Sequence, residues 1–252
     1  MDISGFQVLV LLLLGVVAGF VNTVSAAGSL VSITALMFTG LSGTEANASN
    51  RVAVLAQNFS STYTFLQKGY RTDAYLLWLS LASVPGAVLG ALFSIKIPEA
   101  LFIHILSGVM LLFLLLTIFN PLKNATAPAE RLDTRSRIAG VILFFLFGIY
   151  GGFIQAGSGF FLMAGCQLLH RFPFAKANFY KAFIMSAYAL AAFLLFVLNG
   201  NIRWVHGLLM AVGMSAGGYV GVRWSIGASE TQIRRVIVAM ILAMVMYLWF
   251  FR

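Results

Sequence analysis

Two basic residues lie inside segments that are otherwise long and apolar. Arg51 and Lys181 each stand about six residues into such a segment, at 45–67 and 175–198, and no Asp or Glu occupies the middle of any apolar segment. An unpaired cation in a bilayer costs at least about 2.5–3.5 kcal/mol. We therefore expect a bound anion to supply the missing counter-charge. The alternative is that each cation reaches a membrane face or bonds backbone carbonyls.

Amide and hydroxyl side chains gather near these cations and near two runs of small residues. We expect three amides to orient the anion, namely Asn22, Asn50 and Gln155. Further candidate residues of the substrate-binding site are Asn47, Asn178, Gln57, Ser25 and Ser158. Helices that begin at breaks beside these residues would add N–H donors and positive dipole ends to the site.

Patterns typical of catalysis and of metal binding are missing from the sequence. The three histidines are dispersed, the single cysteine lies in an apolar segment, and no nucleophile–base pair, zinc motif or phosphate-binding loop is present. We therefore predict that the chain is not an enzyme, that it has no catalytic or metal-ligating residue, and that it needs no cofactor.

The composition indicates which solvent surrounds the chain. Hydrophobic residues make up 61% of the 252 residues and charged residues only 9%, whereas soluble domains carry about 25% charged residues. The surface must therefore face a lipid bilayer. The net charge of +9 is scattered along the chain rather than gathered in a basic stripe, so no nucleic-acid partner is expected. The oligomeric state cannot be read from the sequence.

The apolar segments predict an all-α polytopic membrane protein, because a span needs roughly 20 apolar residues. The segments run at about 5–24, 28–40, 45–67, 72–93, 98–119, 137–157, 159–170, 175–198, 203–223 and 230–251. Two of them, 28–40 and 159–170, are too short to cross comfortably, and each follows a run of small residues. We predict broken helices near 22–29 and 155–159, where the short segments either cross or re-enter. Close helix packing through the small residues is the alternative.

A polar connector at 121–137 divides the chain nearly in half, and the two sides match each other. A shift of 131 residues aligns Asn47 with Asn178 and Gly90 with Gly221; further upstream the shift becomes 133 and places Gly19 on Gly152. We predict a first transmembrane repeat at 1–120, a cytoplasmic connector at 121–137 and a second repeat at 138–252. Each repeat holds about four to five transmembrane or re-entrant helices, and their number makes the two repeats inverted.

The distribution of basic residues predicts the orientation in the membrane. With the connector in the cytoplasm, most Lys and Arg residues fall at cytoplasmic ends, and only Lys96, Arg203 and Arg252 fall on the other side. This is the bias of the positive-inside rule. Both termini are then expected outside the cytoplasm.

Two motifs near the predicted breaks resemble a known family. The first half reads GFVNTVSAAGSL at 19–30 and ANASNRVAV at 46–54; the second half reads GIYGGFIQAGSG at 148–159 and KAN at 176–178. In this order they resemble the TauE/SafE family, also called the sulfite exporter or DUF81 family, over nearly the whole chain. The resemblance implies a bacterial inner-membrane protein that moves small anions such as sulfite, sulfonates or other sulfur-containing or organic anions, often by export. Asn22, Asn50, Arg51 and Gln155 fall within the family's motifs.

The function that these observations favour is secondary transport of a small anion by alternating access between two inverted repeats. In this hypothesis Arg51 and Lys181 neutralise the anion. A passive anion channel is one alternative. A non-transporting membrane scaffold or assembly protein is another, and it would show no stabilisation by an anion.

Overall fold

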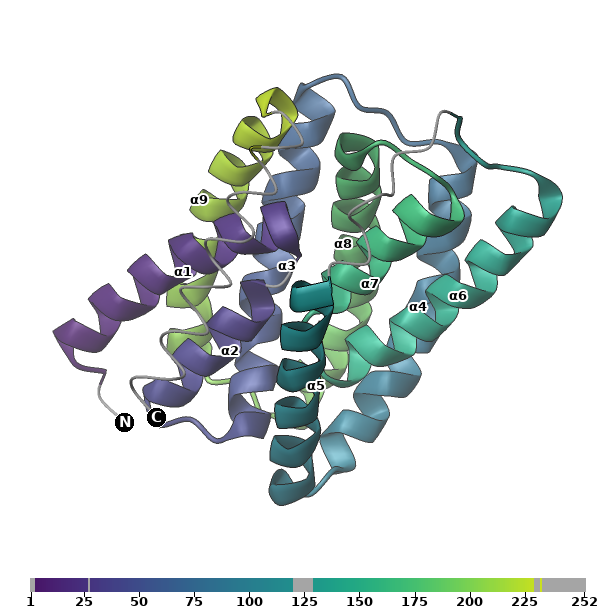
Figure 1. Cartoon of the computed structure of the whole chain (residues 1–252). Coiled ribbons are helices and arrows are strands. Elements are labelled where there is room, and N and C mark those ends of the chain that lie inside the picture. The colour runs from purple at the N-terminus through teal and green to yellow at the C-terminus, as the bar shows by residue number, and fades with distance from the viewer. Residues whose placement is uncertain (1–2, 27, 120–128, 229–231, 233–252) are drawn as a thin grey trace.

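The computed structural model describes residues 3–26, 28–119, 129–228 and 232, apart from the side chains of Ser25 and of 113–119. The described part is helical and contains no strand (Figure 1). Before the connector the helices are α1 Gly5–Ser25, α2 Gly28–Phe38, α3 Gly43–Gln67, α4 Ala74–Lys96 and α5 Glu99–Phe119. After it they are α6 Thr134–Phe153, α7 Ser158–Ala164, α8 Phe174–Asn199 and α9 Trp204–Gly227, and α7 continues as a π-helical turn, Gly165–Leu169.

Among the described residues, five helices are long and apolar enough to cross a bilayer, namely α1, α4, α6, α8 and α9. The chain is therefore an all-α polytopic integral membrane protein, as predicted. Every predicted segment from 5–24 to 203–223 coincides with an observed helix to within a few residues. The predicted segment 230–251 lies outside the described residues.

Polar residues placed just before several helices satisfy N–H groups that have no partner within the helix. Ser4 and Ser42 each form a capping box at the start of α1 and α3,. Asp133 caps α6, and a hydrogen bond from Arg131 lowers the pKa of its carboxyl. The cap is therefore an anion at the positive end of the helix, where a negative charge is stabilising.

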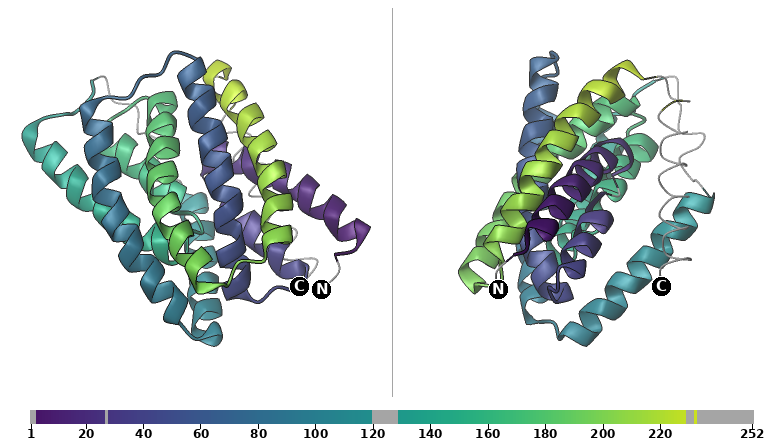
Figure 2. Two further views of the ribbon diagram at one scale, coloured as in Figure 1. Left: turned by 180° about the vertical axis from the view of Figure 1, so that it is seen from behind. Right: turned by 90° about the vertical axis from the view of Figure 1, so that its left-hand side faces the viewer.

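The two halves interlock through matched helix pairs. α1 packs along α9 and α4 packs along α6, so the first helix of each half lies against the fourth helix of the other half (Figure 2). α3 and α8 contact each other, and each also contacts the fourth helix of the opposite half. Glycines allow these close crossings, because a Cβ on Gly90 would collide with the Ile149 carbonyl oxygen, and one on Gly217 with that of Val16,.

The chain runs in opposite directions through the two halves. In Figure 1, α3 rises from the lower to the upper edge of the molecule, and α8 descends. α2 turns back toward the edge near which α1 begins, and α7 turns back toward the side from which α6 comes. This is the arrangement of an inverted repeat. The division at 1–120, 121–137 and 138–252 stays a prediction, and α6 begins at Thr134, inside the predicted connector.

Both predicted breaks are present in the helices. α1 ends before Ala26, whose φ is 62°, and α6 ends shortly before Gln155, whose φ is 53°. A positive φ is uncommon and strained for a residue other than glycine, because Cβ crowds the following carbonyl oxygen. The left-handed residue turns the chain out of the first helix and lets a new helix start beside it.

The structure corrects the register between the first helices of the two halves. Ala26 and Gln155 occupy matching positions, so the shift here is 129, the separation of these two residues. The same shift relates Gly19 to Gly148, which face α9 and α4 in matching places. The predicted shift of 133, which placed Gly19 on Gly152, is therefore wrong by one helical turn. Glycines recur along this helix face, so a slip of one turn still superposes glycine on glycine.

Candidate functional site

Arg51 of α3 lies against the end of α6. In the fully buried guanidinium, Nη1 donates to the carbonyl oxygen of Gly151 at 3.4 Å, and Nη2 donates to those of Gly152 at 2.5 Å and Phe153 at 3.2 Å. The ring of Phe196 covers the guanidinium, with 4.1 Å between Cζ and the ring centroid. The last turn of α6 therefore receives donors for carbonyls that have no partner within the helix.

Lys181 of α8 lies against the end of α1 in the same manner. Its buried Nζ donates to the carbonyl oxygen of Asn22 at 2.8 Å and to that of Thr23 at 3.2 Å. The side-chain amide of Asn178 donates to the same Thr23 oxygen at 2.9 Å. A cation and an amide from one helix thus hold the end of another.

These two cation sites are equivalent under the repeat. In each, a cation from the third helix of one half binds the end of the first helix of the other half. Asn47 repeats the role of Asn178, since its amide donates to the Phe153 carbonyl oxygen at 3.3 Å. By the shift of 129, Asn22 corresponds to Gly151. By the shift of 131, Lys181 corresponds to Asn50, the neighbour of Arg51, so the two cations occupy adjacent positions of the repeat and contact matching helix ends.

The contacts of the two cations bear on how their charge is balanced. The end of a helix carries a partial negative charge, roughly half an elementary charge, and a cation there is stabilising. Backbone carbonyls are the partners that sequence reasoning kept as the alternative to a bound anion. Because a helix end carries only about half a charge, these carbonyls balance the positive charge of Arg51 or Lys181 only in part. Binding of an anion by Arg51 and Lys181 stays a prediction.

Hydroxyl groups hold the break between α6 and α7. The Gln155 carbonyl oxygen accepts from Ser158 Oγ at 2.8 Å and from Ser29 Oγ at 3.3 Å. Ser29 Oγ in turn accepts from the Gly157 N–H at 2.9 Å, and the Tyr188 hydroxyl donates to Ser158 Oγ at 2.9 Å. Because Ser29 lies in the first turn of α2, its bonds join the break of one half to the short helix of the other.

Side-chain amides hold the break between α1 and α2. Asn22 Nδ2 donates to Gln57 Oε1 at 2.6 Å, and Gln57 Nε2 donates to Thr23 Oγ1 at 3.1 Å and to Ser61 Oγ at 2.9 Å. All four side chains are buried. Gln57 therefore ties the last turn of α1 to the centre of α3.

Three buried N–H donors at the breaks have no partner among the described residues: Arg51 Nε, Asn50 Nδ2 and Gln155 Nε2. Asn50 uses only its oxygen, which accepts from Ser32 Oγ at 2.6 Å, and neither side-chain amide atom of Gln155 is paired. A buried donor left unpaired costs about 1–3 kcal/mol. The side-chain oxygens of Asn22, Asn47, Asn178 and Gln155 are also buried and unpaired. Buried polar groups without a protein partner are typical of a site that takes a polar ligand.

Apart from Ser25, whose side chain lies outside the described part, the predicted site residues are all buried. They lie at the ends of α1 and α6, on α3 and α8, and at the start of α7. Sequence reasoning missed the hydroxyl groups that support these residues, namely Thr23, Ser29, Ser32 and Tyr188. Tyr188 could have been found, because the repeat shift of 131 makes it the equivalent of Gln57, which was predicted. The serines carry no signal of their own in an apolar helix.

Two interlocked halves, a broken helix in each, and a buried polar centre where the breaks meet define a membrane transporter of the inverted-repeat type. The family profile described as Sulfite exporter TauE/SafE matches residues 11–248. The chain belongs to this family.

Similar chains carry names that agree with this class. A probable membrane transporter protein of Haemophilus influenzae is 29% identical over 244 residues, which cover 95% of this chain and 93% of that protein. The probable membrane transporter protein YfcA of Escherichia coli K12 is 27% identical over 232 residues, covering 91% of this chain and 84% of that protein. A probable membrane transporter protein of a Sinorhizobium species is 27% identical over 232 residues, covering 90% of this chain and 87% of that protein. No solved structure matches the chain.

Proposed function

We propose that the chain is a secondary transporter, and specifically an exporter, of a small anion such as sulfite, a sulfonate or another sulfur-containing or organic anion. The observation that carries this proposal is that two buried cations, Arg51 and Lys181, contact the ends of the two broken helices, and that buried N–H donors of Arg51, Asn50 and Gln155 are unpaired. A site of this composition favours a negatively charged ligand that accepts hydrogen bonds.

Arg51 and Lys181 neutralise the anion in this proposal, and Asn50, Gln155 and Asn22 orient it. The guanidinium has donors to spare, because Nε is unpaired while Nη1 and Nη2 hold the end of α6,. An anion draws N–H donors away from the helix ends, which weakens the contact between the third helix of one half and the first helix of the other. Substrate binding thereby becomes linked to movement of the halves, as alternating access requires.

The orientation belongs to the same proposal. We place the connector in the cytoplasm, the protein in the bacterial inner membrane and both termini outside. An anion that leaves a negative interior gains about 2.3 kcal/mol per charge for each 100 mV. A reporter fused to the C-terminus tests the orientation, and activity of a cytoplasm-specific reporter there overturns it. Insensitivity of efflux to an imposed potential counts against potential-driven export.

Gln155→Met provides the sharpest test of the site, because the Gln155 side chain makes no hydrogen bond to the described protein. The variant should fold at least as stably as the wild type and should lose most anion binding. Purified protein is heated with sulfite, sulfate, thiosulfate, sulfonates or small carboxylates, and stabilisation by a ligand is measured as a rise in unfolding temperature. The control is Lys68→Gln, an exposed cation at the end of α3, which should respond as the wild type does.

Transport itself is measured in proteoliposomes. A carrier shows saturable counterflow that depends on the anion inside, whereas a channel shows no acceleration by exchange. Arg51→Ala and Lys181→Ala should each abolish counterflow while the protein remains inserted. Wild-type counterflow in both variants overturns the proposed site. A protein that no anion stabilises and that carries no flux is instead a scaffold.

A further inference from the structure

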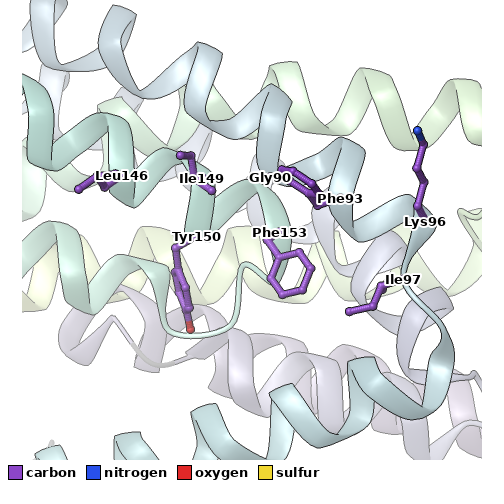
Figure 3. Close-up of a pocket in the computed structure, with 8 residues that line it drawn as sticks. All are labelled: Gly90, Phe93, Lys96, Ile97, Leu146, Ile149, Tyr150 and Phe153. Carbon is purple, nitrogen blue, oxygen red and sulfur yellow. The ribbon is translucent and has the colours of Figure 1, made fainter.

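An apolar groove opens on the side of the α4–α6 pair, away from the hydrogen-bonded centre. Its volume is about 630 Å³, and its lining includes Phe93 and Lys96 of α4 and Ile149, Tyr150 and Phe153 of α6. Figure 3 shows the rings of Tyr150 and Phe153 extending to the same side of the two helices. The groove lies beside the close crossing of α4 and α6 at Gly90.

The matching place in the other half is filled. By the repeat shifts, Phe93 corresponds to Trp224 and Ile149 to Phe20, and the rings of Trp224 and Phe20 contact each other with 5.6 Å between centroids. Lys96 corresponds to Gly227, which carries no side chain. The groove and its cation therefore belong to one half only. They are not a necessary consequence of the fold.

The chemistry of the groove changes along its length. Its walls are apolar, and the Phe93 side chain is 68% exposed although the groove lies beside it. Lys96 stands at the last turn of α4 and is exposed, and its side chain makes no ion pair or hydrogen bond with the described residues. In Figure 3 its ammonium extends away from the apolar residues. A long apolar wall that ends at a free cation is complementary to an amphiphile with an anionic head.

We propose that this groove binds an anionic phospholipid, with an acyl chain along Phe93, Ile149 and Phe153 and the phosphate group at Lys96. The lipid then touches residues that hold the break between α6 and α7. The Tyr150 hydroxyl donates to the Ala156 carbonyl oxygen at 2.6 Å, and the Phe153 carbonyl oxygen accepts from Arg51. The occupant thereby stabilises the α6 end in the position seen here. This site is independent of the proposed substrate.

The test compares retention of two lipids that differ only in head-group charge. The purified full chain is mixed with phosphatidylglycerol or phosphatidylcholine of the same acyl composition, and retained lipid is counted by native mass spectrometry. We expect about fivefold preference for phosphatidylglycerol, the effect of one cation near an anionic head group. Lys96→Gln should abolish this preference, and Lys68→Gln, which changes an exposed cation elsewhere, should keep it.

A second variant separates the groove from the charge. Leu146→Trp places a bulky ring in the groove from the exposed face of α6, and it should reduce retention of both lipids. Equal retention of the two lipids by the wild type overturns the proposal. So does an unchanged preference in Lys96→Gln, or unchanged retention of both lipids in Leu146→Trp. Because Lys96 and Leu146 are exposed, these variants should fold, and their unfolding temperatures are measured alongside.

Discussion

α3 and α8 are the matching central helices of the two halves, yet their side chains differ greatly. α8 is apolar enough to count as a span, with a mean hydropathy of 2.1, and α3 is not, although it has 25 residues. At equivalent positions under the shift of 131, polar residues of α3 are matched by less polar residues of α8: Gln57 by Tyr188, Asn58 by Ala189, Ser61 by Ala192 and Thr62 by Phe193. Because α3 packs against α1, α2, α8 and α9, its polar face is shielded from lipid. The duplication thus retained the backbone arrangement while the chemistry of the halves diverged.

The same divergence appears at the two breaks. At the end of α1, Asn22 is hydrogen-bonded to Gln57. At the end of α6, Gly151 stands in the place of Asn22, and the Tyr188 ring fills the space that a side chain would need. The first break is therefore tied down by side-chain amides. At the second break the side-chain amide of Gln155 is unpaired.

The largest expected effect contrasts the two cations. Arg51→Ala leaves the carbonyl oxygens of Gly151 and Gly152 without their side-chain donor, while Asn47 still donates to that of Phe153. It also removes the contact with Phe196, so it should lower the free energy of unfolding by about 3–5 kcal/mol. Lys181→Ala should cost less, because both of its carbonyl acceptors keep another donor: the Ala26 N–H donates to Asn22, and Asn178 donates to Thr23. Unfolding in mixed micelles measures both, with Lys68→Ala as the control. A larger loss in Lys181→Ala than in Arg51→Ala contradicts the comparison.

The next prediction concerns whether Gly151 is needed to leave space for the Tyr188 ring. A Cβ on Gly151 would lie 2.7 Å from the Tyr188 hydroxyl oxygen, so Gly151→Ala should destabilise the protein by about 1–3 kcal/mol through overpacking. Gly108→Ala in α5 is the control, because nothing lies within 4 Å of its Cβ. Adding Tyr188→Leu should recover part of the loss. Independent, additive losses would show that the two residues do not share this space.

A third prediction compares neighbouring amides on α3. Gln57→Leu leaves the Asn22 amide nitrogen and the Ser61 hydroxyl without the partner that Gln57 supplies, while the Thr23 hydroxyl still donates to the Gly19 carbonyl oxygen. The variant should cost about 1–3 kcal/mol. Asn58→Leu should be nearly neutral, because Asn58 makes one bond to its own helix while its oxygen is unpaired. The same unfolding measurement ranks them. Equal losses would mean that the polar face of α3 acts as a whole rather than through Gln57.

The smallest effect concerns the hydroxyl of Tyr188. Tyr188→Phe removes one hydrogen bond to Ser158 and should lower the free energy of unfolding by about 1 kcal/mol. Hydrogen exchange of the backbone should become faster at 155–158 and stay unchanged at 28–30, because the bond supports only the second break. Equal acceleration at both breaks would show that they open together.

Much of the fold was predictable because lipid imposes simple demands. Apolar length predicted the described helices, and the small residues before 28–40 and 159–170 predicted the breaks. The register of the first helices was not predictable, since glycines one turn apart gave a plausible but wrong match. Segment 230–251 and the side chain of Ser25 lie outside the described residues, so those predictions stand untested.

The candidate site was predictable in its members but not in its bonding. Arg51, Lys181 and the nearby amides stand out because polar groups are rare in apolar helices. Their partners could not be found in the same way, because the acceptors are backbone carbonyls, which every residue carries. Tyr188 was missed because an aromatic residue stands where the first half has the amide of Gln57. In a membrane helix, an aromatic side chain is usually interpreted as a packing residue.

By itself the sequence determined the solvent of this protein, its helices, its two breaks and the rarity of charge within them, since each follows from local composition and length. Only the tertiary structure decided what the two cations touch. The carbonyl oxygens that accept from Arg51 and Lys181 lie at helix ends, and each of these ends belongs to the opposite half of the chain, which only the folded arrangement brings within reach.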